Sequence, residues 1–139
     1  MAKFVLKSAT VTVNAVDLTA HISSVTIETT ADEVDVTAFG STYREILQGM
    51  GDATITLDFF QDFAASKVDA TLWPLASAGT TFPVTVKPTS ASVSSTNPRY
   101  DMTGVILTYN PIDGAVGDAS TTSVTIRNAS STGLTRNTT

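Results

Sequence analysis

A two-residue alternation of apolar and polar side chains recurs along almost the whole chain and restricts the fold to β structure. The clearest case is residues 54–59, where Thr or Asp separates Ile55, Leu57 and Phe59. Successive side chains of a strand point to opposite faces, so this pattern predicts a strand with one buried and one polar face. Similar runs predict strands within residues 3–13, 16–18, 24–28, 33–37, 81–87, 99–109 and around 124–126.

The period changes to that of a helix between Ser66 and Ser77. Val68, Leu72 and Leu75 fall on one helical face. Ser66, with an acidic residue three positions later, predicts the N-cap, and Gly79 predicts the end.

Pro74 lies inside this segment, and an internal proline removes a hydrogen bond, so we expect about two turns, loosened near Trp73. Trp73 is expected to pack the helix on a sheet. About eight strands and one helix predict a mainly β fold, a β-sandwich or partly rolled barrel with one short flanking α-helix.

The chain has 139 residues, which suits one domain with a core. We predict a single domain over residues 1–128, with Asn14-Ala15 as a tight turn, and a flexible tail over 129–139 that lacks periodicity. The longest strand candidate slips at Gly104, and a glycine inside a strand often marks a bulge or bend. This strand is therefore expected to cross from one sheet to another.

The segment from Ser24 to Asp62 holds two strand patterns joined by an acidic, then glycine-punctuated, connection of about twenty residues. Such a connection is too long for a hairpin turn, and unstructured loops of this length are usually functional or disordered. We expect a long arm at about residues 38–52. A small β domain with such an arm is typical of a subunit that assembles with its neighbours.

Charge excludes one class of function. The net charge is −5 and only 15% of residues are charged, while Thr and Ser make up more than a quarter of the chain. An acidic chain is a poor match for a nucleic-acid binder that neutralises phosphates. The acidic residues concentrate between Glu28 and Asp69, where we interpret them either as solvated strand edges that discourage aggregation or as a functional negative surface.

No catalytic, metal or cofactor site is predicted, and the chain is not expected to be an enzyme. It has no cysteine and one histidine, His21, too few for a zinc site. Asp32, Glu33 and Asp35 are close in sequence but lack the glycine and distal glutamate of a calcium loop. We also expect no signal peptide and no membrane-spanning segment.

Four segments carry a resemblance to a known family: VTVNAVDLTAHISSVTIETTADEVDVTAFG, YREILQGMGDATITLDFFQD, NPRYDMTGVILTYNPIDGAVGD and the closing SVTIR. In their order and residue pattern these segments resemble the major tail (tail tube) proteins of long, non-contractile-tailed bacteriophages. The resemblance covers most of the chain from Val11 to Arg127.

The resemblance implies a β-sandwich subunit whose copies form hexameric rings with a continuous inner β-barrel. The rings would stack into a hollow tube around a tape-measure protein, and DNA would later pass through the lumen without specific binding. It implies a virion tail component, assembled in the host bacterial cytoplasm with other tail proteins and without a membrane.

The resemblance also implies surfaces. The residues expected in the inter-subunit arm are Phe39, Tyr43, Arg44, Glu45, Ile46, Leu47 and Met50. The residues expected on the lumen or another acidic surface are Glu28, Asp32, Glu33, Asp35 and Asp58. The segment Met1–Lys7 and the C-terminal tail are further contact candidates.

Several alternatives stay open at the level of sequence. The arm could be an ordinary loop folded onto its own domain. The whole chain could instead be a type VI secretion-like tube subunit, a capsid decoration or fibre domain, or a carbohydrate-active β domain.

Overall fold

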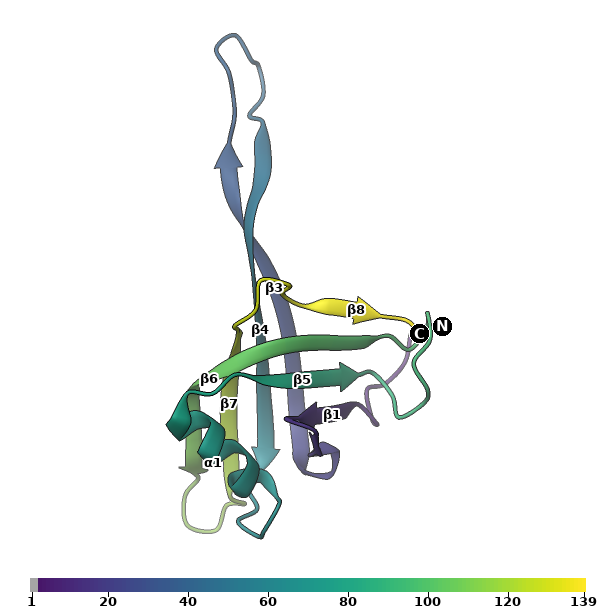
Figure 1. Ribbon diagram of the computed structural model, residues 1–139, viewed down its shortest axis with the longest axis vertical. Coiled ribbons are helices and arrows are strands. Elements are labelled where there is room, and N and C mark those ends of the chain that lie inside the picture. Colours follow the sequence, from purple (N-terminus) through teal and green to yellow (C-terminus); the bar gives the residue numbers. More distant parts are fainter. Residues whose placement is uncertain (1–2) are drawn as a thin grey trace.

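The computed structural model describes residues 3–139 of the chain (Figure 1). Met1 and Ala2, which begin one of the predicted contact segments, lie outside the described residues. The elements in chain order are β1 (Thr10–Val13), β2 (Val16–Asp17), the 3-10 turn η1 (Thr19–His21), β3 (Ile22–Asp35), β4 (Ile46–Phe60), α1 (Val68–Ala78), β5 (Phe82–Lys87), β6 (Arg99–Asp113), β7 (Thr121–Asn128) and β8 (Thr135–Asn137).

The eight strands form one antiparallel sheet in the order β2-β1-β5-β6-β7-β4-β3, with β8 also paired to β6. Strand β6 pairs with β5 through residues 100–104 and with β7 through residues 104–113. In Figure 1 it first runs beside β5 and then turns to run beside β7, so the sheet bends over itself around a core. The predicted sandwich-like fold with one helix is confirmed, and the sheet is not closed into a barrel.

Gly104 lies at this bend. A Cβ atom there would lie 2.5 Å from Cγ2 of Ile126 and 2.8 Å from the carbonyl oxygen of Arg127, so β7 approaches too closely for any other residue. The register irregularities of β6 lie further along, between Ile106 and Thr108 and again before Asp113. The strand therefore carries one sheet around a corner instead of crossing between two sheets.

The core is built by the alternation that the sequence displays. Buried side chains come from both halves of the bent sheet and from the helix: Val11, Val13, Leu18, Ala53, Ile55, Leu57, Phe59, Val68, Leu72, Leu75, Phe82, Val84, Val86, Met102, Ile106, Val124 and Ile126. Burying each large apolar side chain contributes about 1.5–3 kcal/mol. Helix α1 packs on β6 and closes one end of the core.

The apolar face of the helix is confirmed, because Val68, Leu72 and Leu75 are buried. Its predicted start is wrong. The N-cap is Lys67, no side chain caps the helix, and the preceding Ser66 has a φ of 62°. Gly79 ends the helix as predicted, in the left-handed conformation with its N–H bonded to the Leu75 carbonyl oxygen at 3.2 Å.

The predicted length of the helix is also wrong, because α1 does not end near Trp73 but continues through Pro74 to a total length of eleven residues. A proline removes a single backbone donor, and the buried Leu75 that follows anchors the last turn on the core. Trp73 is 55% exposed and does not pack the helix onto the sheet.

The tight turn at Asn14-Ala15 is confirmed by the positive φ of both residues, 48° and 66°. The tail differs from expectation, because Thr135–Asn137 form β8. These residues pair with Arg99–Asp101, a part of β6 that β7 does not reach because β7 ends opposite Gly104. A free stretch of ladder thus gives the tail a strand partner that its own sequence does not reveal.

Candidate assembly surfaces

Strands β3 and β4 extend well beyond the rest of the sheet. Strand β7 pairs with β4 only from Thr54 to Phe60, whereas β3 stays paired with β4 out to Asp35 opposite Ile46. Residues 31–51 therefore project as a two-stranded hairpin, here called the arm, which rises from the sandwich in Figure 1.

The connection between the two strands is ten residues, 36–45, not about twenty, so the expectation that it could not be a hairpin is wrong. Two of the glycines that punctuate the segment, Gly49 and Gly51, lie within β4 and not in a loop. Gly49 faces β3 so closely that a Cβ atom there would lie 3.0 Å from Cγ2 of Val34. This close packing, which favours glycine in a strand, explains why the sequence signal for a loop was misleading.

Apolar side chains line the arm without cover. The large exposed ones are Val34, Val36, Phe39, Tyr43, Ile46, Leu47 and Met50. Tyr43 is 86% and Met50 82% exposed. A two-stranded ribbon has no core of its own, and contiguous exposed apolar side chains mark interaction sites. The five apolar residues predicted for the arm thus lie together on it, clear of the sandwich.

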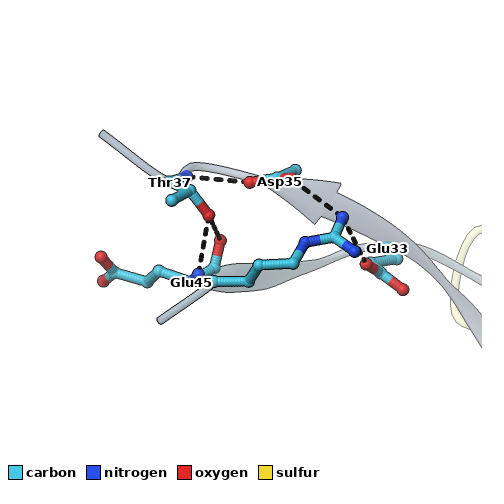
Figure 2. Close-up of polar contacts among 5 residues, drawn as sticks. Glu33, Asp35, Thr37 and Glu45 are labelled. Atoms are coloured by element: carbon cyan, nitrogen blue, oxygen red, sulfur yellow. Dashed lines mark hydrogen bonds and ion pairs between the residues drawn. The ribbon is translucent and has the colours of Figure 1, made fainter. Parts of the chain in front are cut away.

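A set of polar contacts orders the arm below its tip (Figure 2). The carboxylate of Asp35 accepts the Thr37 N–H at 2.9 Å and the Arg44 guanidinium at 3.0 Å. The Thr37 hydroxyl accepts the Glu45 N–H at 2.8 Å. The contacts of Asp35 with Thr37, its backbone N–H first, and with Arg44 lower the pKa of Asp35. The Glu45 carboxylate points away from them and stays exposed.

The five acidic residues predicted for one surface are divided between two places. Glu28 and Asp58 lie on the sandwich, whereas Asp32, Glu33 and Asp35 lie on the arm. Asp35 and Glu33 both face Arg44, the latter at 3.9 Å. With Glu45, the arm carries four carboxylates against one guanidinium.

The outer face of the β7-β4-β3 half of the sheet is polar. Strand pairing places one set of side chains on this face, opposite the core residues: Ser24, Thr26, Glu28, Thr54, Thr56, Asp58, Ser123, Thr125 and Arg127. All are exposed or half-buried, and Arg127 forms an ion pair with Asp52. Hydroxyl groups dominate these nine positions. By the same pairing, two large apolar side chains also lie on this face, Phe60 beyond Asp58 and Val105 of β6 opposite Arg127.

With β6 beyond Gly104 added to this half, the half-sheet β6-β7-β4-β3 has two open edges. Strand β3 pairs only with β4, and β6 beyond Gly104 pairs only with β7, within residues 3–139. Open edges present unpaired backbone groups that can pair with another chain.

The helix is tied to this half by a small polar cluster. The hydroxyl of Tyr109 donates to Asp69 at 2.8 Å and accepts from Gln61 at 3.2 Å. Burial raises the pKa of Tyr109 to about 12.

A basic corner, which sequence reasoning missed, lies where the chain ends meet the ends of β5 and β6 (Figure 1). Its members are Lys3, Lys7, Lys87, Arg99 and Arg136. The pairings of Thr10 with Lys87, Val86 with Tyr100 and Tyr100 with Arg136 bring Lys87, Arg99 and Arg136 together. The N-terminal segment, which carries Lys3 and Lys7 before Thr10, ends beside the C-terminus in Figure 1. These residues are far apart in sequence, so the only signal was their concentration near the two termini and around the loop after β5.

The described part of the chain offers little chemistry. No group of three or more His, Cys, Asp or Glu side chains among residues 3–139 could hold a metal ion. His21 lies 3.9 Å from Asp62 and near no second histidine. Across the same residues, none of the helical segments has the length and apolarity needed to cross a bilayer.

The fold and its surfaces define a class. This is a bent antiparallel sheet with a flanking helix, two open edges, a polar outer face and a projecting hairpin. No protein-family model matches the sequence, and no curated protein matches it.

Solved structures do share the fold. A chain in the virion of a native gene transfer agent particle matches with a TM-score of 0.75 and 17% identity over 94% of this chain and 95% of that chain. A chain in the tail of the empty gene transfer agent particle, refined with C6 symmetry, matches with a TM-score of 0.67 and 18% identity. The match covers 83% of this chain and 81% of that chain.

Two further systems extend this likeness. A chain in the PVC sheath/tube terminator of an extracellular contractile injection system matches with a TM-score of 0.76 and 10% identity. The match covers 99% of this chain and 98% of that chain. The SPP1 tail tube matches with a TM-score of 0.70 and 10% identity over 95% of this chain and 76% of that chain. At these identities the likeness establishes the fold that the sequence resemblance implied.

Proposed function

We propose that this protein is the subunit of a hollow tail tube, a structural virion protein and not an enzyme. The observation that carries the proposal is the half-sheet β6-β7-β4-β3, which has an open edge on each side and an outer face that is polar along most of β7, β4 and β3. Its fold is that of chains in phage-like tails and of the SPP1 tail tube.

The two open edges explain ring formation. If the β3 edge of one copy pairs with the β6 edge of the next, every copy uses two different edges, and the contact closes into a ring by rotation. Closure satisfies the exposed backbone groups and removes the edges that would otherwise aggregate. Six copies, the symmetry of the gene transfer agent tail, would join six half-sheets into one inner barrel.

The polar outer face would then line the lumen. Over most of this face Thr and Ser hydroxyls give no apolar grip, and Glu28 and Asp58 repel phosphate. DNA would pass without specific binding, after a tape-measure protein has occupied the same space during assembly. The protein would act in the virion tail, after assembly with other tail proteins in the host bacterial cytoplasm.

The arm would couple successive rings. It projects beyond the sandwich and carries seven exposed apolar side chains that its own chain cannot cover. Such side chains are suited to form the buried centre of a contact with another copy.

A second candidate is the inner tube of a contractile or secretion-type injection system, favoured by the match to the PVC sheath/tube terminator. Both functions need the same rings and differ in what travels through the lumen. Packaged DNA in particles purified from producing cells would distinguish a phage-type tail from a protein-secretion tube.

Negative-stain electron microscopy of the purified protein tests the proposal. We expect rings and hollow tubes whose length increases with concentration. A protein that stays monomeric at high concentration in several salts would contradict it.

A shortened-arm variant tests the role of the hairpin. Replacing residues 34–47 by Asn-Gly joins Glu33 to Gln48, which are already paired across the hairpin, through a turn suited to two strands. We expect a folded protein that forms rings but not tubes, whereas Ser41→Ala with Thr42→Ala, as a control at the intact tip, should still form tubes. Tubes of normal length from the shortened variant would remove the arm from the axial contact.

A further inference from the structure

The proposed function leaves open where the arm binds on the next copy. The arm reaches at most about 33 Å, the span of the ten residues from Ala31 to Gly40 if each advanced ~3.3 Å. Because the arm is the paired extension of β3 and β4, it projects from the sandwich and does not fold back onto its own domain. Its binding surface must therefore bury apolar side chains and accommodate a net negative charge.

The basic corner has both properties. An apolar groove of about 190 Å³ opens beside it, lined by Leu6, Val25, Ile27, Val86, Tyr100 and the stem of Lys87. Val25 and Ile27 are half-buried and Leu6 is 55% exposed, so the groove has uncovered apolar surface.

The charge of the corner is available to a partner. Two carboxylates lie among the five basic residues, so the corner has an excess of positive charge although Asp17 stays ionised near Lys87. Asp17 accepts the hydroxyl and N–H of Thr19, which lower its pKa, and Asp101 pairs with Arg99 at 2.8 Å. Lys3 and Lys7 form no ion pair with any carboxylate in the described chain. The corner thus keeps a net positive charge to meet the negative arm.

The opposite end of the sandwich is the competing surface. It also exposes apolar side chains, namely Phe63 and Val116 on the loops after β4 and β6 and Ile112 near the end of β6. The loops carry Asp62 and Asp118, and β6 ends at Asp113, with only Lys67 as a basic residue, so an acidic arm would meet like charge. Like charges across an interface cost several kcal/mol, and complementary charges select the partner.

We propose that the basic corner and its apolar groove are the binding site for the arm of a second copy. Apolar side chains of the arm fill the groove, and the arm carboxylates face the lysines and arginines around it. The inference rests on the proposed function, because it assigns the partner surface within the same tube.

Charge reversal tests the pairing. The double variant Lys7→Glu with Lys87→Glu reverses the charge of two residues in the corner. The double variant Asp32→Lys with Glu45→Lys reverses the charge of two arm residues whose carboxylates bind no other side chain in residues 3–139. We expect each double variant to lower the amount of sedimenting tube at least about tenfold, equivalent to 1.4 kcal/mol or more. The quadruple variant should recover tubes, and Lys67→Glu, a matched charge change outside the corner, should assemble normally.

A cysteine cross-link locates the contact independently of charge. Because the chain has no cysteine, single variants can be mixed and oxidised after assembly, with a size tag on one of them. Glu45→Cys mixed with Lys87→Cys should give the tagged heterodimer, whereas Glu45→Cys mixed with Val116→Cys should not.

Cross-linking to Val116→Cys instead, or no recovery in the quadruple variant, would overturn the assignment while leaving the tube subunit intact. If the unmodified protein forms no tubes, the proposed function fails first and takes this inference with it.

Discussion

Substituting Gly104 by alanine should destabilise the protein more than any other glycine-to-alanine change within a strand. The added Cβ would lie 2.5 Å from Cγ2 of Ile126 and 2.8 Å from the carbonyl oxygen of Arg127. Real Cβ contacts need well over 3 Å, so either the backbone of β7 or the corner of β6 must move. Inserting one carbon into a packed core costs typically about 1–3 kcal/mol.

Gly51→Ala is the matched control. Gly51 is also a strand glycine without a positive φ, and its Cβ would meet only the carbonyl oxygen of Thr30 at 3.7 Å, an ordinary contact. Reduced freedom of the unfolded chain should stabilise this variant by about 0.4–1 kcal/mol. The two alanine variants are therefore expected to differ by roughly 1.5–4 kcal/mol in the free energy of unfolding.

Urea denaturation followed by circular dichroism measures this difference. It should be done on protein kept below the concentration at which it assembles, because association would raise apparent stability. The expected Tm difference is roughly 3–4 °C per kcal/mol for a chain of this size. If Gly104→Ala is as stable as Gly51→Ala, β7 does not approach the corner as described and the reasoning about the bend is refuted.

Four further outcomes are expected. Asn97→Ala should cost about 1–3 kcal/mol, because this buried side chain bonds four backbone groups of the loop after β5. Pro74→Ala should stabilise the protein by about 1 kcal/mol or more in urea denaturation, since proline inside a helix costs up to about 3 kcal/mol and this one is exposed. Between pH 10 and 12 stability should fall, because the unfolded chain gains by ionising Tyr109 before the folded chain does, and Tyr109→Phe should reduce that fall. An NMR titration should give Asp35 a pKa below the ordinary value of an aspartate. The stabilisation from its contacts is then fully present above the ordinary pKa and is lost as the pH falls through the lowered pKa. Arg44→Ala should raise the pKa of Asp35.

Each of these has an opposite result that counts against the structure. Equal stability of Asn97→Ala and the parent would mean that the loop is not held by this side chain. A less stable Pro74→Ala would mean that the proline is favourable in its helix. A pH profile unchanged in Tyr109→Phe would place the alkaline loss elsewhere. An unshifted Asp35 would mean that the contacts below the tip do not form in solution.

The strands were predictable because alternation is a local property of the chain. Residues 54–59 show it most clearly, and the structure buries Ile55, Leu57 and Phe59 in the core. The helical face and the Gly79 end were equally readable. The N-cap was not, because Ser66 takes a left-handed conformation that the sequence pattern of a cap does not exclude.

The candidate surfaces were predictable in part. The arm was located from its length and its mixture of apolar and charged residues. Its form was not, since glycines that normally punctuate loops lie here inside β4, at Gly49 and Gly51. The acidic residues could not be assigned to one surface, because faces depend on strand register and a bulge between Ala31 and Glu33 changes that register.

The sequence by itself determined a β domain with one helix, an acidic and hydroxyl-rich exterior, and a projecting arm, because these follow from composition and from the period of neighbouring residues. Only the tertiary structure decided which groups distant in the chain share a surface. Strand pairing brings Lys87, Arg99 and Arg136 to one corner and leaves the edges of β3 and β6 open. Pairing is settled by the packing of the whole core, so the surfaces proposed for assembly are properties of the fold and not of any segment.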